Sequence, residues 1–375
     1  MNIALINWKS FDEISGSRIY MVNSALSLKE KGNNVYILTS GKILPEYENL
    51  GLNFYTIDND NFSEAGFLHF TRFCFKMVEK LKIDIVHAHY NHAFIAADLI
   101  KKKKNIPYFC TFHGYEYELI IKENIKTLCK EALNNANNIF YSSKEIINNF
   151  KEKADIILDE RYIYMPNAVM PVPANQNDHC MAKKIILFVG RLAEEKGLYF
   201  LFEAIKAFRE RRDIELHIVG GGPLADWCKH FIRQNDIGDI IKMIGEVSSK
   251  EVIKRMQDSY MVVLPSVYES MPIVLLEAMA VGKPILATDI YGISNAVENM
   301  KEGLLVENNN ADELISGISR LLDNQELCEN LGNNAKRRAE KEFLWDTVAD
   351  KIINYYKSSL HHEANSKKQL KYYGE

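Results

Sequence analysis

The segment from Leu264 to Ala287, LPSVYESMPIVLLEAMAVGKPILA, has the pattern expected of an anion-binding site. An apolar run that reads as a strand leads into a loop. A helix is predicted to begin near Pro272, because proline suits the first helical position. The first turn of a helix presents backbone N–H groups that lack intrahelical acceptors, and such groups bind phosphates. The predicted donors to a diphosphate are the amides of Ile273, Val274 and Leu275.

Two glutamates accompany these amides. Glu269 lies in the loop and Glu277 lies in the predicted helix, with seven residues between them. Carboxylates beside a phosphate site can accept hydrogen bonds from sugar or ribose hydroxyls. The alternative is an amphipathic helix that carries two solvated glutamates, and the spacing alone does not decide between the two interpretations.

A second segment, FVGRLAEEKG at Phe188–Gly197, places two cations after another apolar run. Gly190 permits a tight exit from the strand, and Arg191 and Lys196 follow it. A guanidinium and an ammonium that converge at a strand end could neutralise a departing diphosphate, and such charge stabilisation is often the largest catalytic contribution. The alternative is a pair of surface cations beside the two intervening glutamates.

Two glycine-containing turns follow other apolar runs. Gly220–Gly222 comes after the run that ends at Val219, and it permits either turn geometry or close approach of a phosphate. Ser15–Ser17 follows the first run and has the same two interpretations.

Four histidines lie near predicted strand ends in the N-terminal half: His87, His89, His92 and His113. His113 directly follows an apolar run, so it is expected at the sheet edge where ligands bind. A zinc site would need an acidic third ligand, and the chain has no HExxH pattern. We therefore expect no metal. His87 and His89 are interpreted as structural or as neighbours of the bound acceptor.

Strands and helices must position these residues. The chain alternates short apolar runs with amphipathic stretches, which is the pattern of alternating strands and helices. Strands are predicted near 2–7, 34–39, 84–88 and 108–111, and again near 184–189, 214–219, 240–244, 261–264 and 284–287. Runs of this kind, buried on both faces, belong to parallel sheets. Three prolines between Tyr164 and Lys184 mark a linker. A long helix is expected over about 326–360, with a break near Phe343–Leu344.

Composition excludes several classes of protein. With 375 residues and a formal net charge of -4, the chain suits two α/β domains and does not favour a nucleic-acid binder. The six scattered cysteines form no CxxC pair, which indicates reduced thiols in a cytoplasmic protein. No signal peptide or membrane span is expected. The stretch Phe67–Lys82 reads either as an amphipathic helix on a lipid surface or as a core-facing helix with a basic edge.

Together these segments resemble the retaining glycosyltransferases of family four, which have the GT-B fold. The resemblance is strongest over Lys184–Val306, where FVGRLAEEKG, GGGP, ESMPIVLLEAMA and GLLV occur in the family's order. It implies two Rossmann-like, doubly wound parallel-sheet domains that face a central cleft. Residues 1–168 would bind the acceptor and 169–344 the donor. A helix at about 345–360 would pack back on the first domain, and 361–375 would form a disordered tail.

The resemblance also implies roles for individual residues. Arg191 and Lys196 match the pair that grips the donor diphosphate, with Gly190 beside them. Glu269 matches the glutamate that contacts the transferred sugar, and Glu277 matches the one that binds ribose. The remaining implied contacts are the Ser270, Met271 and Pro272 backbone with the sugar, Gly245, Glu246 and Val247 with the base, and His113 and Gly16 with the donor.

The implied reaction moves a hexose or N-acetylhexosamine from a nucleotide diphosphate sugar, UDP being favoured over GDP, with no metal or cofactor. The acceptor would be a glycan, a lipid-linked molecule or a small molecule, and a peripheral membrane contact through the N-terminal domain stays open. The chain departs from the family pattern at Ser15, at Ala168 and at Asn295. The alternatives are a nucleotide-sugar 2-epimerase of the same fold and a non-catalytic sugar-nucleotide binder.

Overall fold

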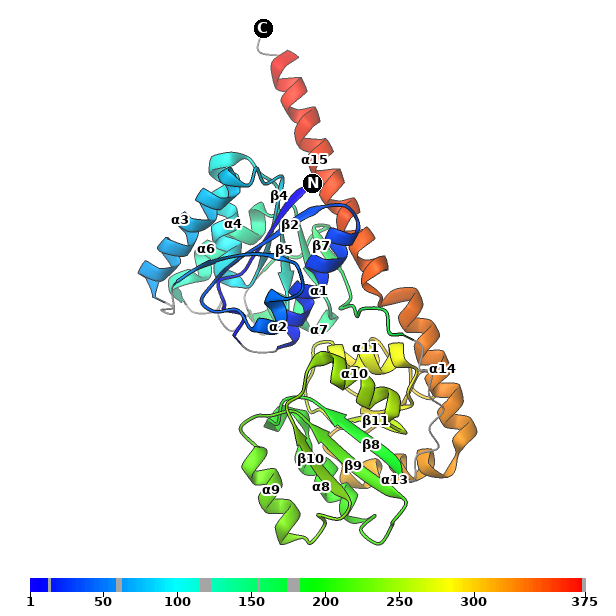
Figure 1. The fold of residues 1–375 in the computed structure, drawn as a ribbon. Coiled ribbons are helices and arrows are strands. Elements are labelled where there is room, and N and C mark those ends of the chain that lie inside the picture. The colour runs from blue at the N-terminus through cyan, green and yellow to red at the C-terminus, as the bar shows by residue number, and fades with distance from the viewer. Residues whose placement is uncertain (13–14, 59–62, 115–122, 154–155, 174–182, 373–375) are drawn as a thin grey trace. The chain divides into compact units, whose positions relative to one another are not determined.

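The computed structural model describes residues 1–12, 15–58, 63–114, 123–153, 156–173 and 183–372. The chain divides into two compact units, each a parallel sheet covered by helices (Figure 1). The first unit comprises Met1–Pro166 and Trp345–Glu375, and the second comprises Asn167–Leu344. The chain thus passes from one unit to the other two residues before the boundary expected at 168/169. Within the predicted linker, residues 174–182 lie outside the described residues.

The first unit is built on a seven-stranded sheet in the order β3-β2-β1-β4-β5-β6-β7, and every paired strand is parallel. The strand order reverses between the neighbours β1 and β4, which makes their carboxyl ends the switch point where ligands bind in such folds. The strands are β1 (Asn2–Ile6), β2 (Asn34–Ser40), β3 (Asn53–Ile57), β4 (Ile85–His89), β5 (Tyr108–Phe112), β6 (Asn138–Tyr141) and β7 (Tyr162–Tyr164).

Helices cover both faces of this sheet. Helices α3, α4 and α6 lie on one face, and α1 and α15 pack against each other on the other (Figure 1). Their bounds, with those of two further helices, are α1 (Gly16–Glu30), α2 (Pro45–Glu48), α3 (Glu64–Lys80), α4 (Asn91–Lys104), α6 (Glu123–Asn135), α7 (Lys144–Lys153) and α15 (Trp345–Tyr372).

Helix α3 turns its aromatic residues toward the core. Phe70 is fully buried, and Phe67, Phe73 and Phe75 pack against the same hydrophobic cluster. The core-facing interpretation of this stretch is therefore the one that the structure shows. Among the helices of the described residues, none has the length and apolar character required to cross a membrane.

Helix α15 begins at Trp345, and the helix before it ends at Glu342, which confirms the predicted break. The ammonium of Lys31 in α1 lies 2.6 Å from Asp346 and 2.7 Å from Asp350, so ion pairs join α15 to this unit. The backbone stays helical to Tyr372, where a disordered tail was expected. Residues 361–372 contain good helix formers, and adding a turn to an existing helix avoids the cost of nucleation.

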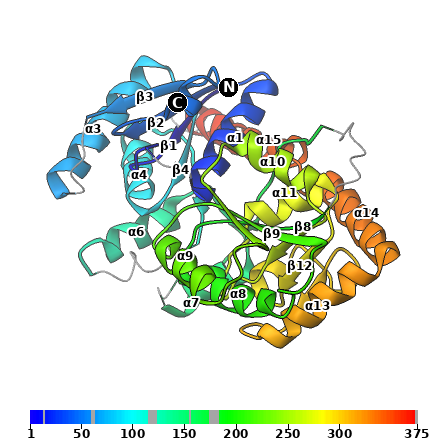
Figure 2. The same cartoon turned by 60° about the horizontal axis from the view of Figure 1, so that its bottom comes forward.

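The second unit has a six-stranded parallel sheet in the order β10-β9-β8-β11-β12-β13. Helices α8, α9 and α13 cover one face, and α10, α11 and α14 cover the other (Figures 1 and 2). The strands are β8 (Lys184–Val189), β9 (Ile214–Val219), β10 (Ile241–Gly245), β11 (Met261–Leu264), β12 (Ile285–Thr288) and β13 (Leu304–Val306). The helices are η1 (Glu194–Lys196), α8 (Leu198–Lys206), α9 (Ala225–Gln234), α10 (Ser249–Asp258), α11 (Ile273–Val281), α12 (Tyr291–Ser294), α13 (Ala311–Asp323) and α14 (Gln325–Glu342).

Strands β8 and β11 are far apart in sequence but adjacent in this sheet. Parallel neighbours end at the same edge, so the loop after β8 meets the loop after β11. These are the two segments that the sequence marked as carriers of chemistry. The topology therefore brings 190–197 and 265–272 together at the switch point.

Candidate active site

Lys196 and Glu269 meet where these two loops meet. The Lys196 Nζ lies 2.5 Å from Glu269 Oε1, and the hydroxyl of Ser266 donates to the same oxygen at 3.0 Å. The Lys196 and Glu269 side chains are only 21% and 11% exposed, respectively, so water screens the pair weakly. Glu269 precedes the first residue of α11 by four positions. The structure thus places a cation and a carboxylate just before the helix predicted to bind a diphosphate.

Arg191 forms an ion pair with Glu195, which lies on the same loop. Its Nη2 donates to Glu195 Oε1 at 2.5 Å, and its side chain is 64% exposed. Arg191 and Lys196 are therefore each paired with a glutamate of their own. An exposed ion pair contributes little free energy, so an incoming diphosphate could displace Glu195 at small cost.

Helix α11 begins one residue later than predicted. Pro272 is its N-cap residue, with φ -69° and ψ 129°, and the Leu275 amide donates to the Pro272 carbonyl at 3.1 Å. The expectation that three amides lack intrahelical partners is therefore wrong for Leu275. Leu275 carries the first amide that donates within the helix, so the amides of Ile273 and Val274 before it have no intrahelical acceptor.

Glu277 projects from the middle of α11 and is half-buried. Its side chain forms no hydrogen bond or ion pair with any residue that the structure describes. Burial raises the pKa of the Glu277 carboxyl to about 7. A carboxylate without a partner in poorly hydrated surroundings costs free energy, and two ribose hydroxyls could supply the missing donors.

Four glycines hold the loops of this site close together. A Cβ on Gly197 would lie 1.9 Å from the Pro265 carbonyl oxygen, and one on Gly292 would lie 2.0 Å from the Glu269 carbonyl oxygen. A Cβ on Gly220 would meet the carbonyl of Gly190 at 2.0 Å, and one on Gly222 would meet that of Leu192 at 2.6 Å. The sequence marked the GGG turn but left its role open. In the structure Gly220 and Gly222 serve close backbone packing.

Gly197→Ala should destabilise the protein by more than about 2 kcal/mol and separate Lys196 from Glu269. Gly197 has φ +65°, and a methyl group would collide with the Pro265 carbonyl. Gly32→Ala is the matched control, because Gly32 has φ +80° and a methyl group there would have no other atom within 4 Å. It should cost only about 1 kcal/mol of backbone strain. Urea denaturation measures both, and equal losses would remove the role assigned to the close contact.

The other predicted donor contacts lie on separate loops. Gly245 ends β10 with φ +83°, its carbonyl accepts from the Gly220 amide at 2.8 Å, and Glu246 and Val247 follow it. In the first unit Gly16 is the first residue of α1. Buried Arg18 supports that loop, donating to the Ser10 carbonyl at 2.6 Å and to Ser15 Oγ at 3.1 Å. Sequence reasoning missed Arg18, since one arginine in a helix carries no distinctive signal.

Three of these histidines, His87, His89 and His113, cluster in the first unit, and His87 and His89 are fully buried. His89 Nδ1 lies 2.9 Å from His113 Nε2, and His87 bridges Thr111 at 2.7 Å and Tyr356 at 2.6 Å. Burial lowers the pKa of His113 to about 3, so it stays neutral at physiological pH. His89 Nε2 has no partner within the described part of the chain. We expect the lone pair there, which leaves the His89 Nδ1–H to donate to His113.

Over the described residues, no three His, Cys, Asp or Glu side chains are grouped to hold a metal ion. Five cysteines, at positions 74, 110, 129, 228 and 328, are buried and free, and Cys180 lies outside the described residues.

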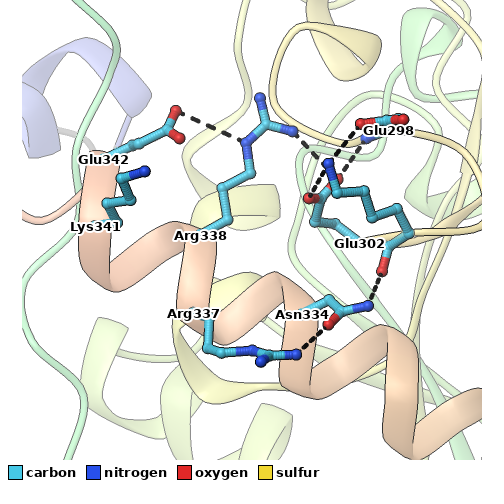
Figure 3. Close-up of a pocket in the computed structure, with 8 residues that line it drawn as sticks. Glu298, Glu302, Asn334, Arg337, Arg338, Lys341 and Glu342 are labelled. Carbon is cyan, nitrogen blue, oxygen red and sulfur yellow. Dashed lines mark hydrogen bonds and ion pairs between the residues drawn. The ribbon is translucent and has the colours of Figure 1, made fainter.

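A pocket of about 460 Å³ lies elsewhere in the second unit, between α14 and the segment Glu298–Glu302 (Figure 3). Several of its charges are paired: Arg338 lies 3.2 Å from Glu302, and Lys301 lies 2.8 Å from Glu298. The pocket contains none of the predicted site residues. We interpret the residues that line it as an ion-pair network that stabilises α14.

Comparison with known proteins agrees with this geometry. The family model described as Glycosyltransferase Family 4 matches residues 14–170, and the model described as Glycosyl transferases group 1 matches residues 174–338. An uncharacterized glycosyltransferase of Methanocaldococcus jannaschii is 33% identical over 75% of this chain and 77% of the relative. A second one from that organism is 28% identical over 96% of this chain and 99% of the relative.

The fold has close counterparts among solved structures. The structure of Anabaena HepE in complex with UDP-glucose aligns with a TM-score of 0.80 at 15% identity, over 96% of this chain and 100% of that one. Two parallel α/β sheets of seven and six strands are the architecture of the GT-B fold. The chain therefore belongs to glycosyltransferase family 4, the retaining GT-B enzymes that use nucleotide sugars as donors.

Proposed function

We propose that this enzyme transfers a hexose or N-acetylhexosamine from a UDP-sugar to a glycan, lipid-linked or small-molecule acceptor in cell-surface polysaccharide or glycolipid synthesis. The observation that carries the proposal is the meeting of Lys196, Glu269 and the start of α11 at one sheet edge. The UDP-glucose complex of HepE supports UDP over GDP as the nucleotide.

In the proposed donor site, these groups would contact different parts of the donor. Lys196 and the amides of Ile273 and Val274 would hold the diphosphate, and Arg191 would join them after leaving Glu195. Glu269 would accept hydrogen bonds from sugar hydroxyls once Lys196 turns to the phosphate. Glu277 would accept from the ribose, and the loop Gly245–Val247 would contact the base.

The chemistry would take place on one face of the sugar. The bond between the anomeric carbon and the diphosphate oxygen breaks, and Lys196 stabilises the negative charge that develops on that oxygen. The acceptor hydroxyl forms the new bond from the same side, which retains the anomeric configuration. Its proton passes to the leaving phosphate oxygen, so the protein needs no separate base.

The acceptor is assigned to the first unit, Met1–Pro166 with the returning helix α15. His113 would donate a hydrogen bond to the donor sugar, in its neutral form, and Gly16 would let the donor approach the first loop. The proposed location is the cytoplasm, where the thiols of buried cysteines stay reduced.

Thermal unfolding with a panel of nucleotide sugars tests the donor assignment. We expect UDP-sugars to raise Tm more than GDP-sugars, with UDP and GDP alone as controls, because only a bound ligand stabilises the folded state. The best donor is then incubated with and without acceptors. An epimerised donor in the absence of acceptor would indicate a 2-epimerase instead, and binding without turnover of any acceptor would indicate a non-catalytic binder.

A further inference from the structure

Asn167 connects the point where the chain enters the second unit to the proposed diphosphate site. It is the first residue of that unit. Its side-chain Nδ2 donates to the Met271 carbonyl at 2.7 Å, and its backbone N–H lies 3.3 Å from the Met271 sulfur. A carbonyl only accepts hydrogen bonds, so the NH2 end of the Asn167 amide must face it.

The Met271 carbonyl is an unusual point of attachment. It belongs to the peptide that joins Met271 to Pro272, and proline has no N–H. The carbonyl oxygen is therefore the only hydrogen-bonding atom of that peptide unit. Pro272 is the N-cap of α11, so the plane of this peptide sets the direction in which Ile273 and Val274 present their amides.

The segment that carries Asn167 is itself anchored. The Val169 amide donates to the Phe343 carbonyl at 2.9 Å, and Val169 pairs in parallel with Leu344. The chain enters the unit at Asn167 and leaves it at Leu344. The entering and leaving segments are therefore bound to each other, and from that fixed base the Asn167 amide reaches the Met271 carbonyl just before α11.

We propose that Asn167 is a positioning residue of the donor site, which holds the Met271–Pro272 peptide so that the first amides of α11 face the diphosphate. This inference rests on the proposed function, because it needs a diphosphate at α11. In the sequence, Asn167 falls in the stretch between Tyr164 and Lys184 that was predicted to be a linker.

The test uses Asn167→Asp in the full-length enzyme. Aspartate has nearly the same shape, but its carboxylate cannot donate and would repel the Met271 carbonyl. We expect the affinity for UDP and for UDP-glucose to fall by the same factor, roughly tenfold, the equivalent of one lost hydrogen bond. The factors should agree because both ligands share the diphosphate. Isothermal titration calorimetry measures both.

Asn235→Asp is the matched control. Asn235 also donates from Nδ2 to a backbone carbonyl, that of Phe231 at 2.9 Å, at the end of α9 in the same unit. The Asn235→Asp variant should bind UDP and UDP-glucose with the affinity of the wild type. If Asn167→Asp and Asn235→Asp have comparable Tm values, the difference in affinity between them does not come from a difference in folding.

Lys196→Met separates the inference from the function on which it rests. If Asn167→Asp binds UDP like the wild type while Lys196→Met binds it more weakly, Asn167 has no positioning role and the donor site stands. If neither variant loses affinity, the site at α11 is itself wrong and the inference falls with it.

Discussion

Lys196→Met should lower kcat/KM for sugar transfer by about a thousandfold while the protein stays folded. The ammonium is the cation that the structure places in front of α11, and electrostatic stabilisation of a leaving group is commonly worth that much. Methionine keeps the length of the side chain, so the change removes charge and little packing. Steady-state kinetics with the donor found by the panel measures the effect.

Two further variants define what that loss means. Lys206→Met removes a similar ammonium on α8, paired with Glu203 at 2.6 Å, and should keep full activity. Lys196→Met leaves Glu269 without its cation, which should lower Tm. The double variant Lys196→Met/Glu269→Gln removes the unpaired charge as well, so it should regain Tm but not activity. Wild-type kcat/KM in Lys196→Met would remove the lysine from the mechanism.

Glu277→Gln should make the ligand-free protein more stable at pH 8, by about 3 kcal/mol. The folded-state pKa is about 7 and the ordinary value is 4.5, so the folded protein holds the proton more tightly than the unfolded chain does. The stability that this carboxyl contributes is complete below pH 4.5 and is lost as the pH rises to 7. Glutamine stays neutral and avoids that loss. Urea denaturation between about pH 4.5 and 8 measures the difference.

The same substitution should weaken donor binding by roughly 10- to 100-fold, because hydrogen bonds to a charged acceptor are worth about 1.5–3 kcal/mol. Glu340→Gln, an exposed glutamate on α14, is the control and should change neither stability nor affinity. A residue placed to bind a ligand should behave in this way: its replacement makes the protein more stable and weakens ligand binding. A Glu277→Gln variant that is less stable at pH 8 and binds the donor normally would contradict the assignment.

The sequence was informative wherever the signal is local. Continuous apolar runs predicted strands buried on both faces, and the two sheets have those strands. The break near Phe343–Leu344 followed from the helical pattern, and the start of α11 followed from Pro272 to within one residue. The order of the motifs from Lys184 to Val306 identified the family before any contact was known.

Several features of the site could be identified only in the folded structure. The Arg191–Glu195 pair, the Leu275 hydrogen bond to Pro272 and the hydrogen bond between His89 and His113 all differ from or add to what the pattern suggested. Where several groups lie near one another, differences in distance of an ångström or less determine which of them form a hydrogen bond or an ion pair. Spacing along a sequence does not contain that information.

The sequence by itself determined the elements, the family and the residue types at the site, because periodicity, turn residues and motif order act over a few positions. Only the tertiary structure decided which of them touch. Lys196 and Glu269 are 73 residues apart, and Asn167 and Met271 are 104 apart. Such contacts depend on which strands the crossover helices make adjacent and on where glycine allows two backbones to meet, and both are properties of the wound sheet rather than of any local stretch.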